Sequence, residues 1–195
     1  MIDSADIRFI MVFPKIPIDG EFSFQDLPGS GKRIDVLCRS LAACFDWCPT
    51  MGLPIKMELV AVLSDMVLLT FTTCTDCIGK GETWWAKIIQ STLKDQNPPD
   101  FVNMSLSSLE DYLSMISAEG DQIFVLDEAG ESVGSFGRER SSQYSFMLGN
   151  HEGFDGNTRE VIRKFKLPSV SLGNTSFLGS QCIAMIISRF ERRQR

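Results

Sequence analysis

The chain lacks several features that would place it in a common class. None of its apolar runs approaches the roughly 20 residues that a membrane-spanning helix needs. No basic region precedes the apolar segment near the amino terminus, so a secretory signal is not expected. These absences favour a cytoplasmic protein without a membrane partner.

Histidine and paired cysteine motifs are also scarce. His151 is the only histidine, and no serine or cysteine constellation surrounds it in sequence, so a hydrolase triad has no support. Cys74 and Cys77 form the only CxxC pair, and a structural zinc site would need a second pair at suitable spacing. We therefore expect no metal, and we expect thiols, as is usual in the cytosol. Zinc or redox chemistry at Cys74 and Cys77 is the alternative, which bound metal or a reactive thiol pair would reveal.

Acidic residues outnumber basic ones. The 195 residues include 25 Asp and Glu against 19 Lys and Arg, which gives a formal net charge of −6. This balance argues against sequence-blind binding to nucleic acid, although local basic patches decide contact. The basic residues gather in four clusters: Lys32, Arg33 and Arg39; Arg138 and Arg140; Arg159, Arg163, Lys164 and Lys166; and Arg189, Arg192, Arg193 and Arg195. Each cluster is open to two interpretations, a solvated surface or a contact with nucleic acid.

Hydrophobic patterning predicts alternating strands and helices. Apolar runs bounded by turn residues predict strands at 7–13, 57–63, 66–73, 122–126, 144–148 and 169–172, with a hairpin turn at Ser64 and Asp65. Helical spacing predicts helices at 32–45, 82–93, 105–116, 158–165 and 176–192, with Ser30 as N-cap of the first and Leu106 on the apolar face of the third. This alternation indicates an α/β fold with a mainly parallel sheet, built as a single domain.

The last predicted helix is apolar on nearly every side. Its apolar residues include Leu178, Cys182, Ile183, Met185, Ile186, Ile187 and Phe190. Because such a helix is normally covered over most of its circumference, it lies either at the centre of the fold or at a subunit interface, and we favour the interface.

A glycine-containing segment precedes the first predicted helix. The residues from Asp26 to Arg33 read Asp-Leu-Pro-Gly-Ser-Gly-Lys-Arg. They fail the phosphate-loop pattern, because Asp26 stands where the first glycine belongs and Arg33 replaces the hydroxyl that binds magnesium. Asp35 and Arg39 follow, four residues apart. They read either as an exposed ion pair, worth about 0.3–0.5 kcal/mol, or as a carboxylate steered by arginine beside an anionic substrate.

Two segments near the carboxyl terminus end apolar runs in small and polar residues. One is Met147-Leu-Gly-Asn-His-Glu-Gly153, and the other is Val170-Ser-Leu-Gly-Asn-Thr-Ser-Phe-Leu-Gly-Ser-Gln-Cys-Ile183. They predict a strand–loop unit and a strand–loop–helix unit, whose backbone groups are free to hold a small ligand. We therefore expect these loops to carry the function.

Taken together, the segment 26–39 and the two carboxyl-terminal segments resemble the archaeal tRNA pseudouridine-54 N1-methyltransferases, the TrmY type of the SPOUT superfamily. The resemblance implies a SPOUT fold: a mainly parallel sheet flanked by helices in one domain over 1–195, with a trefoil knot in about 121–195. It also implies a homodimer, S-adenosylmethionine as methyl donor, and N1 of a pseudouridine in the T-loop of tRNA as acceptor.

The resemblance further implies roles for individual residues. The family's cofactor contacts fall on Leu126, Gly149, Leu172, Gly173, Asn174, Thr175, Ser176, Phe177 and Cys182. A base must accept the N1 proton, and Asp35 is the candidate, with Arg33 orienting it or binding a phosphate. Lys32, Arg33 and Arg39 are the expected RNA contacts. The chain departs from the family at Asn150, where Gly-Asp-His is usual, so a carboxylate is lost.

Two further functions are compatible with the same residues. One is an RNA-binding relative of the same fold with weak or no catalysis, which would bind no S-adenosylmethionine. The other is a methyltransferase of the same fold that acts on a different RNA position. Surface shape decides RNA recognition, so the residues alone do not separate them.

Overall fold

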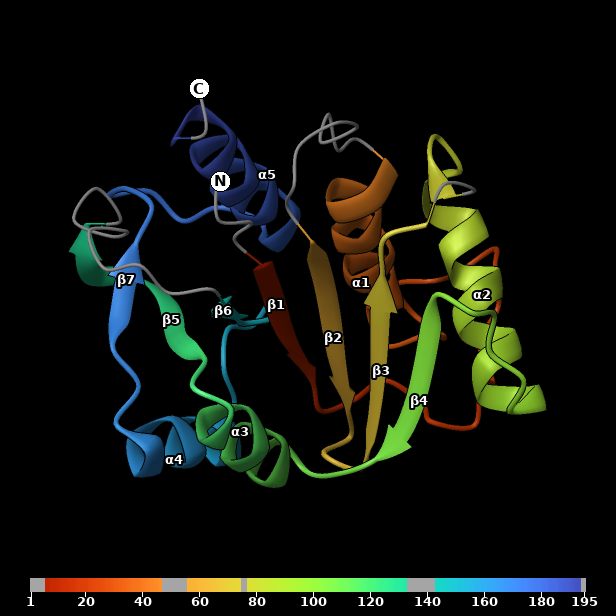
Figure 1. The fold of residues 1–195 in the computed structure, drawn as a ribbon. Coiled ribbons are helices and arrows are strands. Elements are labelled where there is room, and N and C mark those ends of the chain that lie inside the picture. The colour runs from red at the N-terminus through yellow and green to blue at the C-terminus, as the bar shows by residue number, and fades with distance from the viewer. Residues whose placement is uncertain (1–5, 47–55, 75–76, 133–142, 194–195) are drawn as a thin grey trace.

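A seven-stranded sheet forms the centre of the protein in the computed structural model, which describes residues 6–46, 56–74, 77–132 and 143–193 (Figure 1). The strands are β1 (Asp6–Phe13), β2 (Met57–Leu63), β3 (Val67–Thr72), β4 (Val102–Leu106), β5 (Gln122–Ser132), β6 (Gln143–Leu148) and β7 (Ser169–Ser171). The helices are α1 (Ile34–Leu41), α2 (Gly81–Asp95), α3 (Leu109–Ala118), α4 (Gly156–Phe165) and α5 (Gly179–Arg193), and a π-helical turn, η1 (Ala42–Asp46), follows α1.

The sheet is mainly parallel, as predicted. Its strand order is β4-β3-β2-β1-β6-β5-β7. The pairs β2–β1, β1–β6, β6–β5 and β5–β7 are parallel, whereas β3 pairs antiparallel with both β2 and β4. Ser64 and Asp65 make the β2–β3 turn, both with positive φ, which confirms the predicted hairpin. The carboxyl ends of β1, β5, β6 and β7 therefore meet at one edge of the sheet.

Helices cover both faces of the sheet. Helices α1, α2 and α5 pack on one face, and α3 and α4 pack on the other (Figure 1). Neighbouring residues of β1 point to opposite layers: Phe9 and Met11 belong to the first core, and Ile10 and Val12 belong to the second. This double cover explains why β1 is a continuous apolar run rather than an alternating one.

The first helix begins later than predicted. Lys32 and Arg33 have φ values of 48° and 70°, so the left-handed backbone at these residues stops the helix from starting before Ile34. Ser30 is not the N-cap, and the prediction was wrong. Its hydroxyl donates to the backbone oxygen of Asp26 at 2.6 Å, and Arg33 is the residue at the helix start. The helix also widens into η1 after Leu41.

A strand occupies the start of the predicted helix at 105–116. Strand β4 pairs with β3, and Leu106 at its end is 82% exposed instead of facing a helical core. Helix α3 starts at Leu109, where the hydroxyl of Ser108 accepts a hydrogen bond from the Asp111 amide at 3.1 Å. The helical spacing of Leu106 was coincidental, because pairing with β3 outweighs local periodicity.

The last helix buries one face rather than its whole circumference. Ile183, Ile186 and Ile187 are buried against the first core, whereas Gln181 and Ala184 are exposed. Leu178, expected on this helix, precedes it and is 57% exposed. The apolar residues of α5 are therefore accounted for mainly by the core of this chain.

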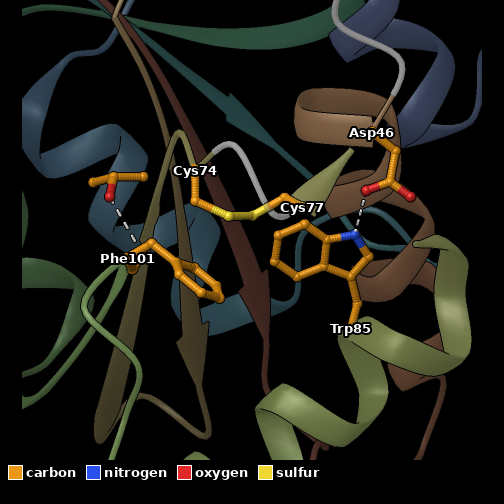
Figure 2. The surroundings of a disulfide bond; sticks show 6 residues. Asp46, Cys74, Cys77, Trp85 and Phe101 are labelled. Atoms are coloured by element: carbon orange, nitrogen blue, oxygen red, sulfur yellow. Dashed lines mark hydrogen bonds between the residues drawn. A yellow bond between two sulfur atoms is a disulfide. The ribbon is translucent and has the colours of Figure 1, made fainter. Parts of the chain in front are cut away.

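Cys74 and Cys77 form a disulfide, which corrects the expectation of thiols at this pair (Figure 2). Beside it, the indole nitrogen of Trp85 donates to the Asp46 carboxylate at 2.9 Å. Cys38 and Cys44 are buried thiols, as predicted. Within the described residues, no group of three His, Cys, Asp or Glu side chains could hold a metal ion. Over the same residues, no helix combines the length and apolarity that crossing a membrane requires.

Candidate active site

A cavity of about 460 Å³ opens at the edge where the carboxyl ends of the parallel strands meet. It is bounded by β5, by the segments that follow β6 and β7, by the start of α5, and by Arg33, Val36 and Arg39 of the α1 region. Ten residues implicated by the sequence line it: Arg33, Arg39, Leu126, Gly149, Leu172, Gly173, Thr175, Ser176, Phe177 and Cys182. Segments far apart in sequence therefore converge at one place, where α/β sheets bind ligands.

The loop after β7 is held in shape by its own polar groups. The Ser171 hydroxyl donates to the backbone oxygen of Gly173 at 2.8 Å and accepts from the Gly173 amide at 3.1 Å. Gly173 has a φ of 152°, a conformation that favours glycine. At the far end of the loop, the Gln181 side chain accepts from the Leu178 amide at 2.9 Å and so caps the start of α5. The loop thus presents Thr175, Ser176 and Phe177 to the cavity.

The loop after β6 closes on itself through Asn150. Its side-chain oxygen accepts from the Glu152 amide at 2.7 Å, and its backbone oxygen accepts from the Gly153 amide at 3.0 Å. A side chain at Gly149 would lie 2.8 Å from the backbone of Gly153, so glycine is required there for the tight turn. An aspartate at position 150 could accept the same hydrogen bond, so the loop tolerates the departure from the family pattern.

Apolar groups and a thiol form part of the cavity wall. Leu126, Leu148, Leu172 and Phe177 contribute the apolar surface. Burial, assisted by the negative charge of Glu128, raises the pKa of the Cys182 thiol to about 11. Cys182 is therefore protonated at neutral pH and serves as a small wall residue rather than a nucleophile.

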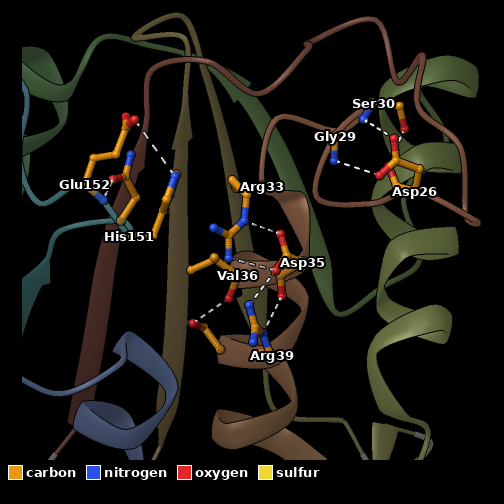
Figure 3. Close-up of polar contacts among 11 residues, drawn as sticks. Asp26, Gly29, Ser30, Arg33, Asp35, Val36, Arg39, His151 and Glu152 are labelled. Atoms are coloured by element: carbon orange, nitrogen blue, oxygen red, sulfur yellow. Dashed lines mark hydrogen bonds and ion pairs between the residues drawn. The ribbon is translucent and has the colours of Figure 1, made fainter.

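Two arginines and one carboxylate form an ion-paired cluster beside the cavity (Figure 3). Arg33 donates to both Asp35 oxygens, from Nε at 3.0 Å and from Nη2 at 3.2 Å. Arg39 donates from Nη2 to Asp35 Oδ2 at 2.5 Å. Asp35 is only 7% exposed. The sequence was compatible with an exposed ion pair of Asp35 and Arg39. In the structure, the Asp35 carboxylate is instead buried and is shared by two arginines.

The Asp35 carboxylate is ionised in this arrangement. Burial opposes ionisation, but the hydrogen bond and charge of Arg33 and the charge of Arg39 outweigh it and lower the pKa of Asp35. Arg33 and Arg39 line the cavity, whereas Asp35 does not. The carboxylate lies behind the two guanidinium groups and holds them toward the cavity. Lys32 and Asn174, also implicated by the sequence, are exposed and do not line it.

Several lining residues were missed from the sequence. The most informative are Asp127 and Glu128, together with His151 and Arg159. A hydrogen bond from the Ser176 hydroxyl lowers the pKa of the Glu128 carboxyl. A signal was present, because Asp127 and Glu128 directly follow the predicted strand at 122–126, and strand ends carry ligands in parallel sheets. Arg159 belonged to a basic cluster that the sequence could not place.

Comparison with known proteins identifies a family that matches this chain. The model of the family described as "Putative SAM-dependent RNA methyltransferase" matches residues 7–195. A tRNA (pseudouridine(54)-N(1))-methyltransferase of Methanococcoides burtonii is 22% identical, over 95% of this chain and 96% of that protein. A protein of the same description from Methanococcus maripaludis is 25% identical, over 95% of this chain and 98% of that protein.

The fold has a counterpart among solved structures. Archaeoglobus fulgidus Nep1, crystallised with S-adenosylhomocysteine, aligns over 100% of both chains with a TM-score of 0.63 at 13% sequence identity. At this identity the likeness concerns the fold, and it agrees with the mainly parallel α/β architecture described above.

Proposed function

The chain belongs to this family of SAM-dependent RNA methyltransferases, and from that premise we propose that it methylates N1 of a pseudouridine in tRNA, at position 54 of the T-loop. One observation carries the proposal. Strand β5, the segments that follow β6 and β7, and the arginines of the α1 region, although remote in sequence, line one cavity. A donor pocket beside a cationic rim is what methyl transfer to an RNA base requires.

The cavity suits S-adenosylmethionine in size and lining. Its volume of about 460 Å³ lies in the range of small-molecule sites. Leu126, Leu172 and Phe177 would enclose the adenine, and the backbone of 173–176 would hydrogen-bond its polar edge. Gly149 and Cys182 complete the proposed contacts, with Asn174 joining from the rim. When bound, the sulfonium supplies an activated methyl group.

The arginines are proposed to bind the RNA. Arg33 and Arg39 line the cavity with side chains that are each 36% exposed, so donors remain available to a phosphate. Lys32, exposed beside them, would add a phosphate contact. Because Asp35 fixes both guanidinium groups, they are oriented before RNA arrives, which reduces the entropy lost on binding.

Asp35 is proposed to accept the N1 proton. Transfer of the methyl group from sulfur to N1 would leave positive charge on N1, and its proton would become strongly acidic. A carboxylate of lowered pKa is then a sufficient acceptor, because the proton is lost during transfer rather than before it. Asp35 lies behind Arg33, so one water would relay the proton from N1. Water then removes the proton and restores the carboxylate.

The finer features of the family are also proposed for this chain. We propose a single domain over 1–195, a trefoil knot in about 121–195, a homodimer and a cytoplasmic location. The apolar surface of Phe177 and Leu178, 36% and 57% exposed at the mouth of the cavity, supports a partner subunit there. Sedimentation that finds only monomer at micromolar concentration would contradict the homodimer.

The test of the function is methyl transfer to defined RNA. Two tRNA transcripts that differ only in pseudouridine or uridine at position 54 are incubated with the protein and labelled S-adenosylmethionine. We expect label only in the first, and N1-methylpseudouridine among its nucleosides by mass spectrometry. Label elsewhere would assign another RNA position. RNA binding without any S-adenosylmethionine heat in calorimetry would indicate a non-catalytic RNA-binding relative.

A further inference from the structure

The cavity carries opposite charges on different walls. Arg33 and Arg39 reach it from α1, whereas Asp127 and Glu128 reach it from β5. Asp127 is already engaged, because its Oδ1 accepts from the Ala129 amide at 2.8 Å. The Ser176 side chain lowers the pKa of the Glu128 carboxyl, and the exposed carboxylate keeps further acceptor positions.

The negative charge of Glu128 acts inside the cavity. Glu128 and Cys182 both line the cavity, although they come from β5 and α5. The carboxylate also contributes, after burial, to the raised pKa of the Cys182 thiol, so its field reaches that wall. Glu128 is ionised at neutral pH, as is usual for an exposed glutamate, and its interaction with Ser176 lowers the pKa of this carboxyl further.

We propose that Glu128 makes the site discriminate the methyl donor from its demethylated product. S-adenosylmethionine carries a sulfonium that S-adenosylhomocysteine lacks, and the two are otherwise alike. A carboxylate on the cavity wall attracts the additional positive charge and contributes nothing comparable to the neutral thioether. Glu128 therefore raises affinity for the donor relative to the product and favours release of the product after transfer. The inference deepens the proposed function and rests on it.

The expected size of the effect follows from the exposure of Glu128. Because the carboxylate is exposed, its attraction for a unit charge a few ångströms away is about 1 kcal/mol, which corresponds to about a fivefold ratio of dissociation constants. Salt should weaken the attraction, since exposed charges are screened. An apolar or steric contribution of the same residue would act on both ligands alike and would not depend on salt.

The experiment compares the full-length wild-type protein with Glu128→Gln by isothermal titration with S-adenosylmethionine and S-adenosylhomocysteine at neutral pH and low salt. We expect the preference for the donor, measured as Kd of the product divided by Kd of the donor, to fall about fivefold in the variant. Rising salt should reduce this preference in the wild type and leave it nearly constant in Glu128→Gln. Glu131→Gln is the matched control, because Glu131 is an exposed residue of the same strand that does not line the cavity.

Each other result counts against the proposal. An equal loss of affinity for both ligands would overturn it, and so would the same fall in Glu131→Gln. Circular dichroism melting of each variant excludes a folding defect, which the exposure of Glu128 makes unexpected. If the wild type binds neither compound, the proposed function itself fails. If the wild type binds both and Glu128→Gln leaves the ratio unchanged, only this inference fails.

Discussion

Two clusters of paired charges lie at opposite edges of the parallel strands. At the carboxyl edge, Asp35 is shared by Arg33 and Arg39. At the amino edge, the relation is inverted, because Arg8 is shared by Glu58, at 2.9 Å, and Asp121. Both central residues are nearly buried, at 7% exposure for Asp35 and 9% for Arg8. The two clusters use the same chemistry, yet of the two only the carboxyl-edge cluster contributes residues to the cavity of the candidate site.

The two clusters differ in whether the side chains around the central residue keep exposed hydrogen-bonding groups beside the cavity. At the amino edge the cluster is closed around Asp121, since the Ser145 hydroxyl donates to Asp121 at 2.7 Å and Tyr112 packs nearby, although the Glu58 side chain is 32% exposed. Burial raises the pKa of that tyrosine well above its usual range. At the carboxyl edge both arginines keep exposed donors on the cavity side. A charge cluster with one partner enclosed in the core therefore supports the fold, whereas one whose two partners keep exposed donors beside a cavity can bind a ligand.

The largest expected effect is on stability and comes from Arg8→Met. The substitution leaves Asp121, whose side chain is 4% exposed, as a buried charge without its cation. We expect the free energy of unfolding to fall by about 3–5 kcal/mol in urea titrations. Methyl transfer per folded molecule should stay within about twofold, because the cluster lies away from the cavity. Lys15→Met removes an exposed partner of Glu152 and should cost less than about 1 kcal/mol.

Asp35→Asn should have the opposite signature, a loss of activity larger than the loss of stability. Without the carboxylate, the N1 proton loses its acceptor and both arginines lose their anchor. We expect kcat/KM on tRNA to fall about 100-fold. Asp26→Asn is the control, because Asp26 holds the preceding loop through Gly29 and does not line the cavity. Undiminished turnover by a folded Asp35→Asn protein would reject both proposed roles.

A smaller effect is expected from Ser145→Ala. Ser145 is fully buried, and its hydroxyl donates to Asp121. Removal should cost about 1–3 kcal/mol of unfolding free energy and leave cofactor affinity unchanged. Ser114→Ala, on the exposed side of α3, removes a hydroxyl that donates to a backbone oxygen and should change stability by less than about 0.5 kcal/mol. Equal costs for the two would mean that the amino-edge cluster is not closed.

The smallest effect is a dependence on pH. The pKa of Asp35 is lower in the folded than in the unfolded chain, so its contribution to stability is fully present above the unfolded value of about 4. It is lost as the pH falls through the lowered folded value. The difference in unfolding free energy between wild type and Asp35→Asn should therefore be constant near neutrality and shrink below about pH 4. A difference that persists unchanged into strong acid would contradict the ion pairing.

Periodicity predicted the core strands well because burial on both faces leaves a run of apolar residues that few other structures use. It failed at Leu106, because helical spacing in a short segment cannot reveal that β3 has an open edge. The N-cap prediction also failed at Ser30. A sequence identifies a capping residue only by its type, whereas the left-handed backbone at Lys32 and Arg33 decided where the helix could start. The residue types at the loops could be read from the sequence, but Glu128 was missed because its significance depends on Ser176 in the loop after β7 and on Cys182 in α5.

By itself, the sequence determined the fold class. It also determined that glycines and small polar residues lie at the ends of the strands, and that a group of arginines follows residue 26. These are local properties, fixed by side-chain chemistry and by spacing along the chain. Only the tertiary structure decided that Asp35 would be buried behind its arginines and that acidic and basic walls would border the same cavity. Parallel strands bring their carboxyl ends together whatever their separation in sequence, so the site exists only once the sheet has formed.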